Sequence, residues 1–209
     1  MGRNPQVAEA TVYRLSRYLQ CIERLEADAV NTVSSSEIGR LCGVSADQVR
    51  KDFSYFGEFG RPGVGYGVAE LNRQLARILR VDRQQRIIIV GVGHLGAALA
   101  AYPGFERRGF RVVGLFDSDP DKIGTTMAGH RVGDVDELST AIDGLNVTIG
   151  VIAVPRRGAQ AVADKMVAAS IGCILNFAPV MLSVPDGIVV KNVDVTRELQ
   201  WLAYFLPAP

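Results

Sequence analysis

Apolar positions follow two different patterns along the chain, and the change between them falls near residue 83. Before it, apolar residues recur at steps of three and four, the spacing that lines one face of a helix. After it, short continuous runs rich in Ile and Val are typical of buried parallel strands. The pattern predicts an α/β chain with a helical domain over residues 1–82, a sheet domain over residues 83–193 and a final segment at 194–209.

The first predicted helix starts at Asn4-Pro5, a suitable cap and first-turn pair, and runs to Glu26. Its apolar face would consist of Val12, Leu15, Leu19 and Ile22. A fourth helix is expected from Val68 to Leu79.

Two shorter helices are predicted in between, separated by a turn that contains Gly43. The serines at 34–36 can cap the first, and Ser45 can cap the second, which runs to about residue 56. The second helix has an apolar stripe formed by Val49, Phe53 and Phe56. At about 100° per residue its opposite face carries Asp47, Arg50, Lys51, Ser54 and Tyr55. The pair fits a helix-turn-helix with a recognition helix at 45–56, but it equally fits ordinary core helices.

The glycine-rich segment from Gly57 to Tyr66 changes that balance. It suits a tight β-hairpin with Arg61 at its tip, as in the wing of a winged helix. An arginine there can enter a narrow minor groove, and the amide of a residue such as Gly63 can approach a phosphate. The segment therefore favours a DNA-binding winged helix, the alternative being a hinge between domains.

A dinucleotide-binding fingerprint opens the second domain. The strand Arg86-Ile-Ile-Ile-Val runs into Gly91-Val-Gly93-His-Leu-Gly96, and a helix follows. The next strand, 111–116, ends in Asp117, which is 21 residues past Gly96 and suits the acceptor of ribose hydroxyls. Further strands are expected at 147–155, 172–179 and 188–193, with helices at 134–142 and 157–169. This alternation predicts a Rossmann domain with a doubly wound parallel sheet.

The residues of the fingerprint indicate NAD(H). Gly91 would allow the tight turn, Gly93 the approach of the pyrophosphate and Gly96 the close packing of the helix. Asp117-Ser-Asp119 puts negative charge where NADP(H) carries its 2′-phosphate, and no basic residue follows before Lys122. The alternative for Asp117 is a simple turn residue at the end of a strand.

Catalytic residues for an oxidoreductase are not evident. The two histidines are His94, inside the glycine loop, and His130, in a predicted surface turn. A dehydrogenase needs an acid or base near the nicotinamide. We therefore expect the nucleotide to act as a signal and the protein not to be an enzyme.

Composition excludes several classes of protein. The 209 residues are 48% hydrophobic with a net charge of +1, and no apolar run suits a signal peptide or membrane span. Cys21, Cys42 and Cys173 are widely spaced, which suggests neither a metal site nor a disulfide framework. We expect a cytoplasmic protein with reduced thiols, no bound metal and no membrane partner.

The last segment suggests a second subunit. Asp194 can cap a helix that is apolar on nearly every side, including Leu199, Trp201 and Phe205. Such a helix needs burial all round, so we expect it to be swapped into the partner of a homodimer. The alternative is packing against its own subunit.

Six motifs, spread over the whole chain, resemble those of the Rex family of redox-sensing transcriptional repressors. They are Val49-Arg-Lys-Asp-Phe-Ser-Tyr-Phe-Gly57, Gly63-Val-Gly-Tyr66, the loop Gly91 to Gly96, Tyr102-Pro-Gly-Phe105, Ile174-Leu-Asn-Phe-Ala-Pro179 and Asn192-Val-Asp194. The resemblance implies a homodimer that binds operator DNA when NADH is scarce and leaves it when NADH binds.

The resemblance also implies two sets of site residues. The DNA-binding set is Ser45, Arg50, Lys51, Ser54, Tyr55, Arg61, Gly63 and Tyr66. The cofactor-binding set is Gly91, Val92, Gly93, His94, Leu95, Gly96, Tyr102, Asp117, Asn176, Phe177, Ala178 and Asp194. The resemblance further implies that an arginine of the first helix pairs with the aspartate that matches Asp194. Gln20 stands at that position here, so Arg17 or Arg24 substitutes or the switch differs.

Two other readings of the second domain remain open at this point. One is a fragment of a small NAD-dependent dehydrogenase or epimerase, and the other is a CoA-binding module.

Overall fold

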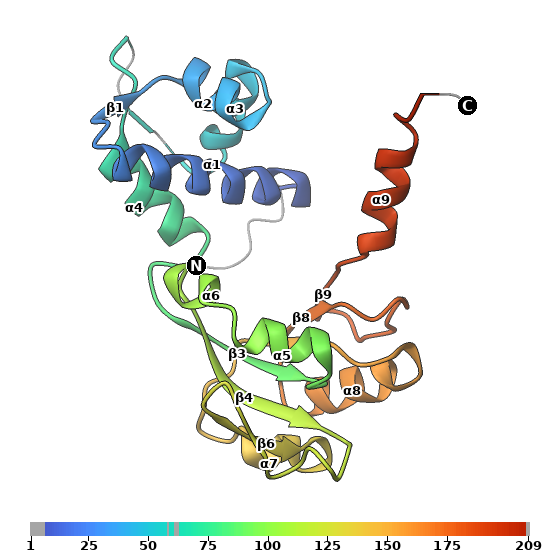
Figure 1. Ribbon diagram of the computed structural model, residues 1–209. Coiled ribbons are helices and arrows are strands. Elements are labelled where there is room, and N and C mark those ends of the chain that lie inside the picture. The colour runs from blue at the N-terminus through green and yellow to red at the C-terminus, as the bar shows by residue number, and fades with distance from the viewer. Residues whose placement is uncertain (1–6, 58, 61–62, 208–209) are drawn as a thin grey trace. The chain divides into compact units, whose positions relative to one another are not determined.

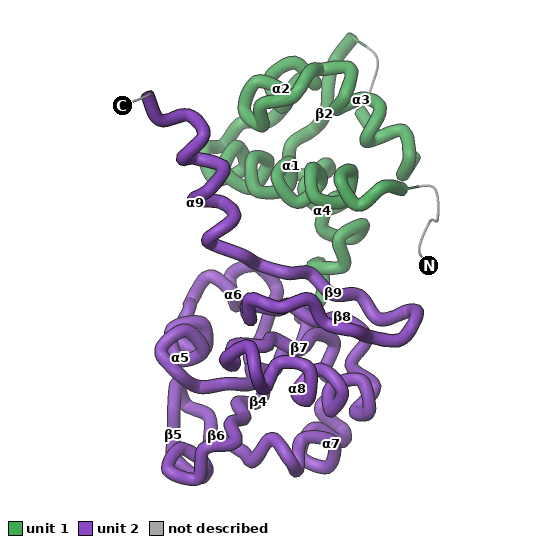
Figure 2. Tube along the Cα trace, turned by 90° about the vertical axis from the view of Figure 1, so that its right-hand side faces the viewer, with its two compact units in different colours: residues 1–83 green, residues 84–209 purple. Residues whose placement is uncertain are grey.

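The computed structural model describes residues 7–57, 59–60 and 63–207. The chain forms two compact units, residues 1–83 and residues 84–209 (Figure 2). Each unit has a hydrophobic core of its own. The division therefore falls in the polar stretch between the two sequence patterns.

The described residues of the first unit form four helices and a short two-stranded sheet (Figure 1). In chain order the elements are α1 (Glu9–Ala27), β1 (Thr32–Val33), α2 (Ser35–Cys42), α3 (Ala46–Ser54), β2 (Tyr66–Gly67) and α4 (Val68–Ile78). Their buried side chains include Leu15, Tyr18, Ile22, Ile38, Val49 and Phe53.

The caps of the helix pair agree with the sequence. Ser34 forms a capping box with Glu37 at the start of α2, and Gly43 ends that helix in the left-handed region. The Ser45 side chain accepts a hydrogen bond of 3.1 Å from the Gln48 amide at the start of α3. Local sequence thus determines where both helices begin.

One expectation for this unit is wrong. Val12 does not belong to the apolar face of α1, since it is 45% exposed while Thr11 and Tyr18 are buried. The strand at Tyr66-Gly67 pairs with Thr32-Val33. The hairpin predicted at 57–66 stays a prediction, since residues 58, 61 and 62 lie outside the described residues. In the described part of that segment, Gly65 forms a β-bridge and Tyr66 lies in a strand. Arg61, the predicted tip, lies outside the described residues.

The part of the second unit that the structure describes contains a seven-stranded sheet in the order β5-β6-β4-β3-β7-β8-β9. Its strands are β3 (Gln85–Val90), β4 (Phe110–Asp117), β5 (Thr126–Met127), β6 (His130–Asp134), β7 (Ile149–Ile152), β8 (Cys173–Asn176) and β9 (Val189–Asn192). All neighbours pair in parallel except β5 and β6. The doubly wound sheet is confirmed, but the β5-β6 hairpin adds two strands, so His130 starts a strand instead of lying in a turn.

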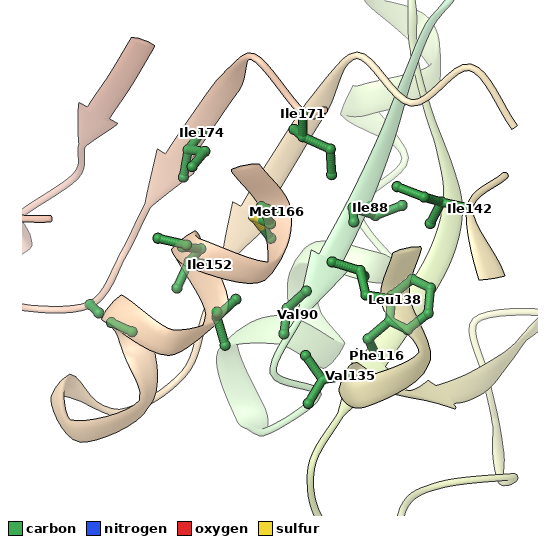
Figure 3. Close-up of a cluster of buried hydrophobic side chains, with 14 residues drawn as sticks. Ile88, Val90, Phe116, Val135, Leu138, Ile142, Ile152, Met166, Ile171 and Ile174 are labelled. Carbon is green, nitrogen blue, oxygen red and sulfur yellow. The ribbon is translucent and has the colours of Figure 1, made fainter. Parts of the chain in front are cut away.

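Helices cover both faces of this sheet. They are α5 (His94–Ala100), α6 (Gly104–Arg107), α7 (Leu138–Ala141) after the 3-10 turn η1 (Val135–Glu137) and α8 (Arg156–Ala168). The last helix, α9 (Val195–Ala203), contributes no buried residue. Ile88 and Val90 of β3 pack with Leu138 and Met166 of α7 and α8 (Figure 3). The alternate residues Ile87 and Ile89 pack on the other face in a second cluster, with Leu99 and Phe105.

Candidate functional site

The topological switch point of the sheet lies at β3, the first strand of the second unit. β4 pairs with one edge of β3 and β7 with the other. A crevice at the carboxyl ends of such strands is where open α/β sheets bind ligands. The glycine loop leaves β3 at that end.

Gly91 and Gly96 allow the loop to turn tightly. Gly91 has a φ of +96°, and a side chain there would begin 2.6 Å from the Ala153 carbonyl oxygen. A Cβ at Gly96 would lie 1.8 Å from the Gly91 carbonyl oxygen. No larger residue fits at either position, so strand and helix approach as closely as the fingerprint requires.

Gly93 differs from these two glycines. It is exposed, caps α5 and has no atom within 4 Å of the position its Cβ would take. The space beside it is thus open on the side where a pyrophosphate would lie. His94 and Leu95 are exposed beside it.

Asp117 is held in place by three groups. Its Oδ2 accepts from the Val92 amide at 2.8 Å and from Lys122 Nζ at 3.3 Å, and its Oδ1 accepts from the Asp119 amide at 3.0 Å. Burial raises the pKa of this carboxyl, but the hydrogen bonds outweigh that effect and keep the pKa below its ordinary value. Asp117 is therefore an ionised acceptor fixed beside the glycine loop.

Lys122 forms ion pairs that were not predicted from the sequence. Its ammonium group lies 3.3 Å from both Asp117 Oδ2 and Asp119 Oδ2. This lysine partly neutralises the acidic pair at the end of β4. The spacing of three residues from Asp119 was a signal for this ion pair.

Asn176 ends β8 and is fully buried. Its amide nitrogen lies within 3.2 Å of the Ala178 oxygen, 2.9 Å of the Val180 oxygen and 2.8 Å of Asn192 Oδ1. Its oxygen accepts from the Ala178 amide at 3.0 Å. The side chain thus shapes the turn after β8 and ties it to β9.

The remaining predicted cofactor residues follow β8, β9 and α5 in the second unit. Phe177 is partly buried in the sheet core and Ala178 is buried. Tyr102 is 49% exposed, with its ring 5.3 Å from the ring of Phe105. Asp194 is exposed and caps α9, accepting from the amides of Thr196 and Arg197 at 3.0 and 3.3 Å.

In the first unit, α3 presents the expected polar face. Ser45, Arg50, Lys51, Ser54 and Tyr55 are all exposed. Arg50 donates a 2.8 Å hydrogen bond to Ser35 of α2 and pairs with Asp47. Gly63 is exposed, whereas the Tyr66 ring is half-buried against Phe53, 5.3 Å between centroids. Arg50, Ser54, Gly63 and Tyr66 line one open cavity of about 570 Å³.

A buried ion-pair network between α1 and α3 holds α3 in place. This network was not predicted from the sequence. Asp52 is 0% exposed and accepts hydrogen bonds from Thr11, Arg14 and Tyr18 of α1 and from Gln48 of its own helix. Asp52 lies three residues after Val49, on the buried side of the helix. An aspartate on the buried side of a helix predicts a buried ion pair or hydrogen bond, because a carboxylate there needs a partner.

Metal and membrane sites do not emerge from the described residues. They contain no group of three or more His, Cys, Asp or Glu side chains arranged to hold a metal ion. No helix among them is both long and apolar enough to cross a bilayer.

Two family models match the two units separately. Residues 6–54 match a model described as "Putative DNA-binding protein N-terminus", and residues 82–180 match one described as "CoA binding domain". Neither model spans both units.

Curated relatives match nearly the whole chain. The redox-sensing transcriptional repressor Rex of Streptomyces avermitilis is 50% identical over 202 residues, which are 97% of this chain and 80% of that protein. Rex of Desulforamulus reducens is 46% identical, with 96% of each chain covered. These relatives are named repressors, which confirms the expectation that the chain is a regulator rather than an enzyme.

Solved structures agree with the sequence relatives. The Rex-family repressor RSP in complex with NAD⁺ and operator DNA has a TM-score of 0.90 and 38% identity, covering 95% of this chain and 91% of that chain. RSP in complex with NADH has a TM-score of 0.87 and 36% identity, covering 96% and 94%. On this fold, with its fingerprint loop and its polar α3 face, the chain belongs to the Rex family of redox-sensing transcriptional repressors.

Proposed function

We propose that this protein represses transcription by binding operator DNA through its first unit and is released when NADH binds its second unit. One observation carries the proposal. A single chain carries both kinds of site. Its first unit has the exposed polar helix α3, with a turn before it and a glycine-rich segment after it. Its second unit has the dinucleotide-binding loop and, beside it, the acidic acceptor Asp117. The solved relative bound to operator DNA and NAD⁺, and its complex with NADH, support the same pair of ligands.

On the DNA side, α3 enters the major groove with Arg50, Lys51, Ser54 and Tyr55 toward DNA, and Ser45 stands at the helix start. Arg50 and Ser35 are hydrogen-bonded, so α2 holds this cation in position. The segment with Arg61, Gly63 and Tyr66 acts as the wing. Helices of a dimer then read half-sites about 34–36 Å apart.

On the nucleotide side, the loop Gly91, Val92, Gly93, His94, Leu95 and Gly96 holds the pyrophosphate, and Asp117 accepts hydrogen bonds from the adenosine ribose. NADPH is disfavoured because its 2′-phosphate would meet Asp117 and Asp119, although Lys122 softens that repulsion. Tyr102, Asn176, Phe177, Ala178 and Asp194 surround the nicotinamide end. Asn176 acts there by shaping the turn, since its amide is already hydrogen-bonded.

The protein acts as a homodimer in the cytoplasm, where operator DNA is found, and α9 is swapped into the partner. In the chain by itself no residue of α9 is buried, and Trp201 is 63% and Phe205 63% exposed. An apolar helix with this exposure gains free energy by inserting into a second subunit. Trp201 is the only tryptophan, so its fluorescence reports on that insertion.

The two sites communicate through Asp194. In the DNA-bound form this carboxylate holds a group of the first helix, at Gln20, Arg17 or Arg24, and with NADH bound it turns to Tyr102. The ligand then favours one of two arrangements of the units. Reciprocity requires operator DNA to weaken NADH binding by the factor that NADH weakens operator binding.

The test is a gel shift with a duplex enriched from random DNA by the purified protein, titrated separately with NADH and NAD⁺. We expect NADH to release the duplex at concentrations where NAD⁺ does not. Failure to enrich any duplex, or release by neither nucleotide, would contradict the proposal. Turnover of NADH with carbonyl substrates would instead support a dehydrogenase, and binding of CoA without NADH a CoA module.

The dimer has its own test in light scattering and tryptophan emission. Dilution to monomer should shift the Trp201 emission to the red, and deletion of residues 195–209 should abolish dimers. A dimer that survives this deletion would overturn the swap.

A further inference from the structure

Two cysteines that are far apart in sequence meet in the first unit. Cys21 lies in the second half of α1 and Cys42 is the last residue of α2. Their Sγ atoms are 2.9 Å apart. A disulfide needs about 2.05 Å between sulfurs, so the two atoms would have to move by about 1 Å to bond.

The two thiols have different surroundings. Cys42 is 1% exposed, and its Sγ lies 3.8 Å from the Arg17 carbonyl oxygen. Burial, followed by the contact with Cys21, raises the pKa of Cys42 to about 12. Cys21 is only half-buried, so a reagent in solution can reach it. Cys21 is therefore the thiol that meets an external reagent, and Cys42 is the thiol behind it.

A disulfide between Cys21 and Cys42 would affect the helix-turn-helix because of where the two cysteines lie. Cys42 is followed directly by Gly43, the turn that leads into α3. A bond from Cys42 to Cys21 would join the first helix of the helix-turn-helix to α1, whose Arg14 and Tyr18 already hold α3 through Asp52. It would close a loop across residues 21–42 and restrict the unfolded chain.

We propose that Cys21 and Cys42 form a reversible dithiol-disulfide site that reacts with low-molecular-weight disulfides and locks α1 to α2. This chemistry is separate from the nucleotide site of the second unit and does not depend on it. Disulfides in reducing compartments are mostly of this transient, redox-responsive kind.

The reaction has two balanced steps. The Cys21 thiolate attacks one sulfur of the reagent RSSR, which forms a mixed disulfide and releases RS⁻, and RS⁻ takes up a proton equivalent to the one that Cys21 lost. Cys42 then gives up its proton and attacks the Cys21 sulfur, and the second RSH leaves. In total two protein thiols are oxidised to one disulfide and RSSR is reduced to two RSH.

The lock should preserve the folded geometry of the first unit, since the sulfurs move so little. We expect the oxidised protein to bind its selected duplex within about threefold of the reduced protein. Amide exchange across residues 21–42 should slow by roughly 30-fold or more, because local unfolding of a cross-linked loop is disfavoured.

The test uses the full chain carrying Cys173→Ser, which removes the exposed third thiol. The protein is equilibrated with mixtures of oxidised and reduced glutathione, alkylated, and digested with trypsin. Cleavage after Arg17, Arg24, Arg40 and Arg50 would place the two cysteines in peptides 18–24 and 41–50. We expect these peptides joined, two hydrogen atoms lighter than their sum, and separated again by reductant. If both thiols stay alkylated even in fully oxidised glutathione, the proposal is wrong.

Two variants test the order of the thiols. Cys42→Ser should accumulate glutathione on Cys21, because no second thiol displaces it. Cys21→Ser should accumulate neither adduct nor cross-link. Glutathione on Cys42 in the Cys21→Ser variant would overturn the assigned order. The result with both thiols present stands whether or not these variants fold.

Discussion

Arg14 and Asp52 form a forked ion pair that joins α1 to the helix proposed to read DNA. Arg14 Nε lies 2.6 Å from Asp52 Oδ2, and Arg14 Nη2 lies 2.7 Å from Oδ1. The Asp52 side chain is completely buried, while the Arg14 side chain is 22% exposed. Because Tyr18 also donates to Asp52 at 2.8 Å, the orientation of α3 depends on one carboxylate.

Asp52→Asn should therefore destabilise the first unit. Removal of one partner leaves Arg14 without its counterion, which costs about 3–5 kcal/mol for a buried pair. Urea unfolding measures this loss. The control Asp47→Asn changes an exposed residue of the same helix and should cost less than about 1 kcal/mol. If Asp52→Asn and Asp47→Asn lower the free energy of unfolding equally, the Arg14–Asp52 pair does not stabilise the first unit as proposed.

The same carboxylate gives the stability a dependence on pH. Burial raises the pKa of Asp52, but the hydrogen bonds from Arg14, Tyr18 and Gln48 outweigh it, so the folded pKa lies below the ordinary value of 3.8. A lowered folded pKa contributes stability above pH 3.8 that is lost as the pH falls through the folded pKa. The difference in unfolding free energy between the natural protein and Asp52→Asn should shrink over that acid range. A difference that stays constant down to pH 2 would refute this linkage.

Two glycines of the nucleotide loop should respond differently to alanine. Gly93→Ala places a methyl group in open space at a φ of −68°, so stability should hardly change, while NADH affinity should fall roughly tenfold or more through loss of close approach. Gly96→Ala forces a clash with the Gly91 carbonyl and should cost about 1–3 kcal/mol. Thermal unfolding and fluorescence titration with NADH measure both. Normal NADH binding by Gly93→Ala would exclude this loop as the pyrophosphate site.

Asp117→Ala should weaken NADH binding by roughly 10- to 100-fold, because a charged acceptor is lost. The natural protein should bind NADPH poorly. Asp117→Asn is the matched control for folding, because its amide oxygen can still accept from the Val92 amide. Equal affinity of the natural protein for NADH and NADPH would contradict the assignment of Asp117.

Lys51→Ala should weaken binding to the selected duplex. It should also reduce the slope of log affinity against log salt concentration by about 1, the value for the loss of one phosphate contact. Lys51 is exposed on the polar face of α3. Lys165→Ala is the control, since Lys165 lies on α8 and pairs with Asp136 at 3.0 Å. If both variants keep the natural affinity and salt slope, α3 does not dock as proposed, and Arg61→Ala then tests the wing alone.

Asp194→Asn separates the switch from the helix cap. Asparagine caps α9 nearly as well as aspartate but carries no charge. With a coupling of about 2 kcal/mol, NADH weakens duplex binding roughly thirtyfold, and this ratio should fall in both Asp194→Asn and Asp194→Ala. The ratio is measured by gel shift with and without saturating NADH. An unchanged ratio in both variants would reduce Asp194 to the cap, and Gln20→Ala tests the partner position.

Sequence alone determined the elements whose signals are local. The capping box at Ser34, the stop at Gly43 and the glycine loop after β3 act within a few residues, so their pattern identified the helix pair and the nucleotide fold. The short β1-β2 ladder and the β5-β6 hairpin were missed. The strands β1, β2 and β5 have only two residues each, too few alternating positions to be recognised. The five residues of β6 include a single apolar side chain that is buried, Val132.

Only tertiary structure decided which distant side chains meet. Arg14 with Asp52, and Cys21 with Cys42, come from different helices, and helical spacing identifies the face of a residue but not its partner on another element. Burial makes both contacts important. A buried carboxylate needs a counterion, and a buried thiol stays protonated. The sequence therefore determined the fold and predicted its two kinds of site. The packing of α1 against α2 and α3 decided what holds the proposed DNA-reading helix in place.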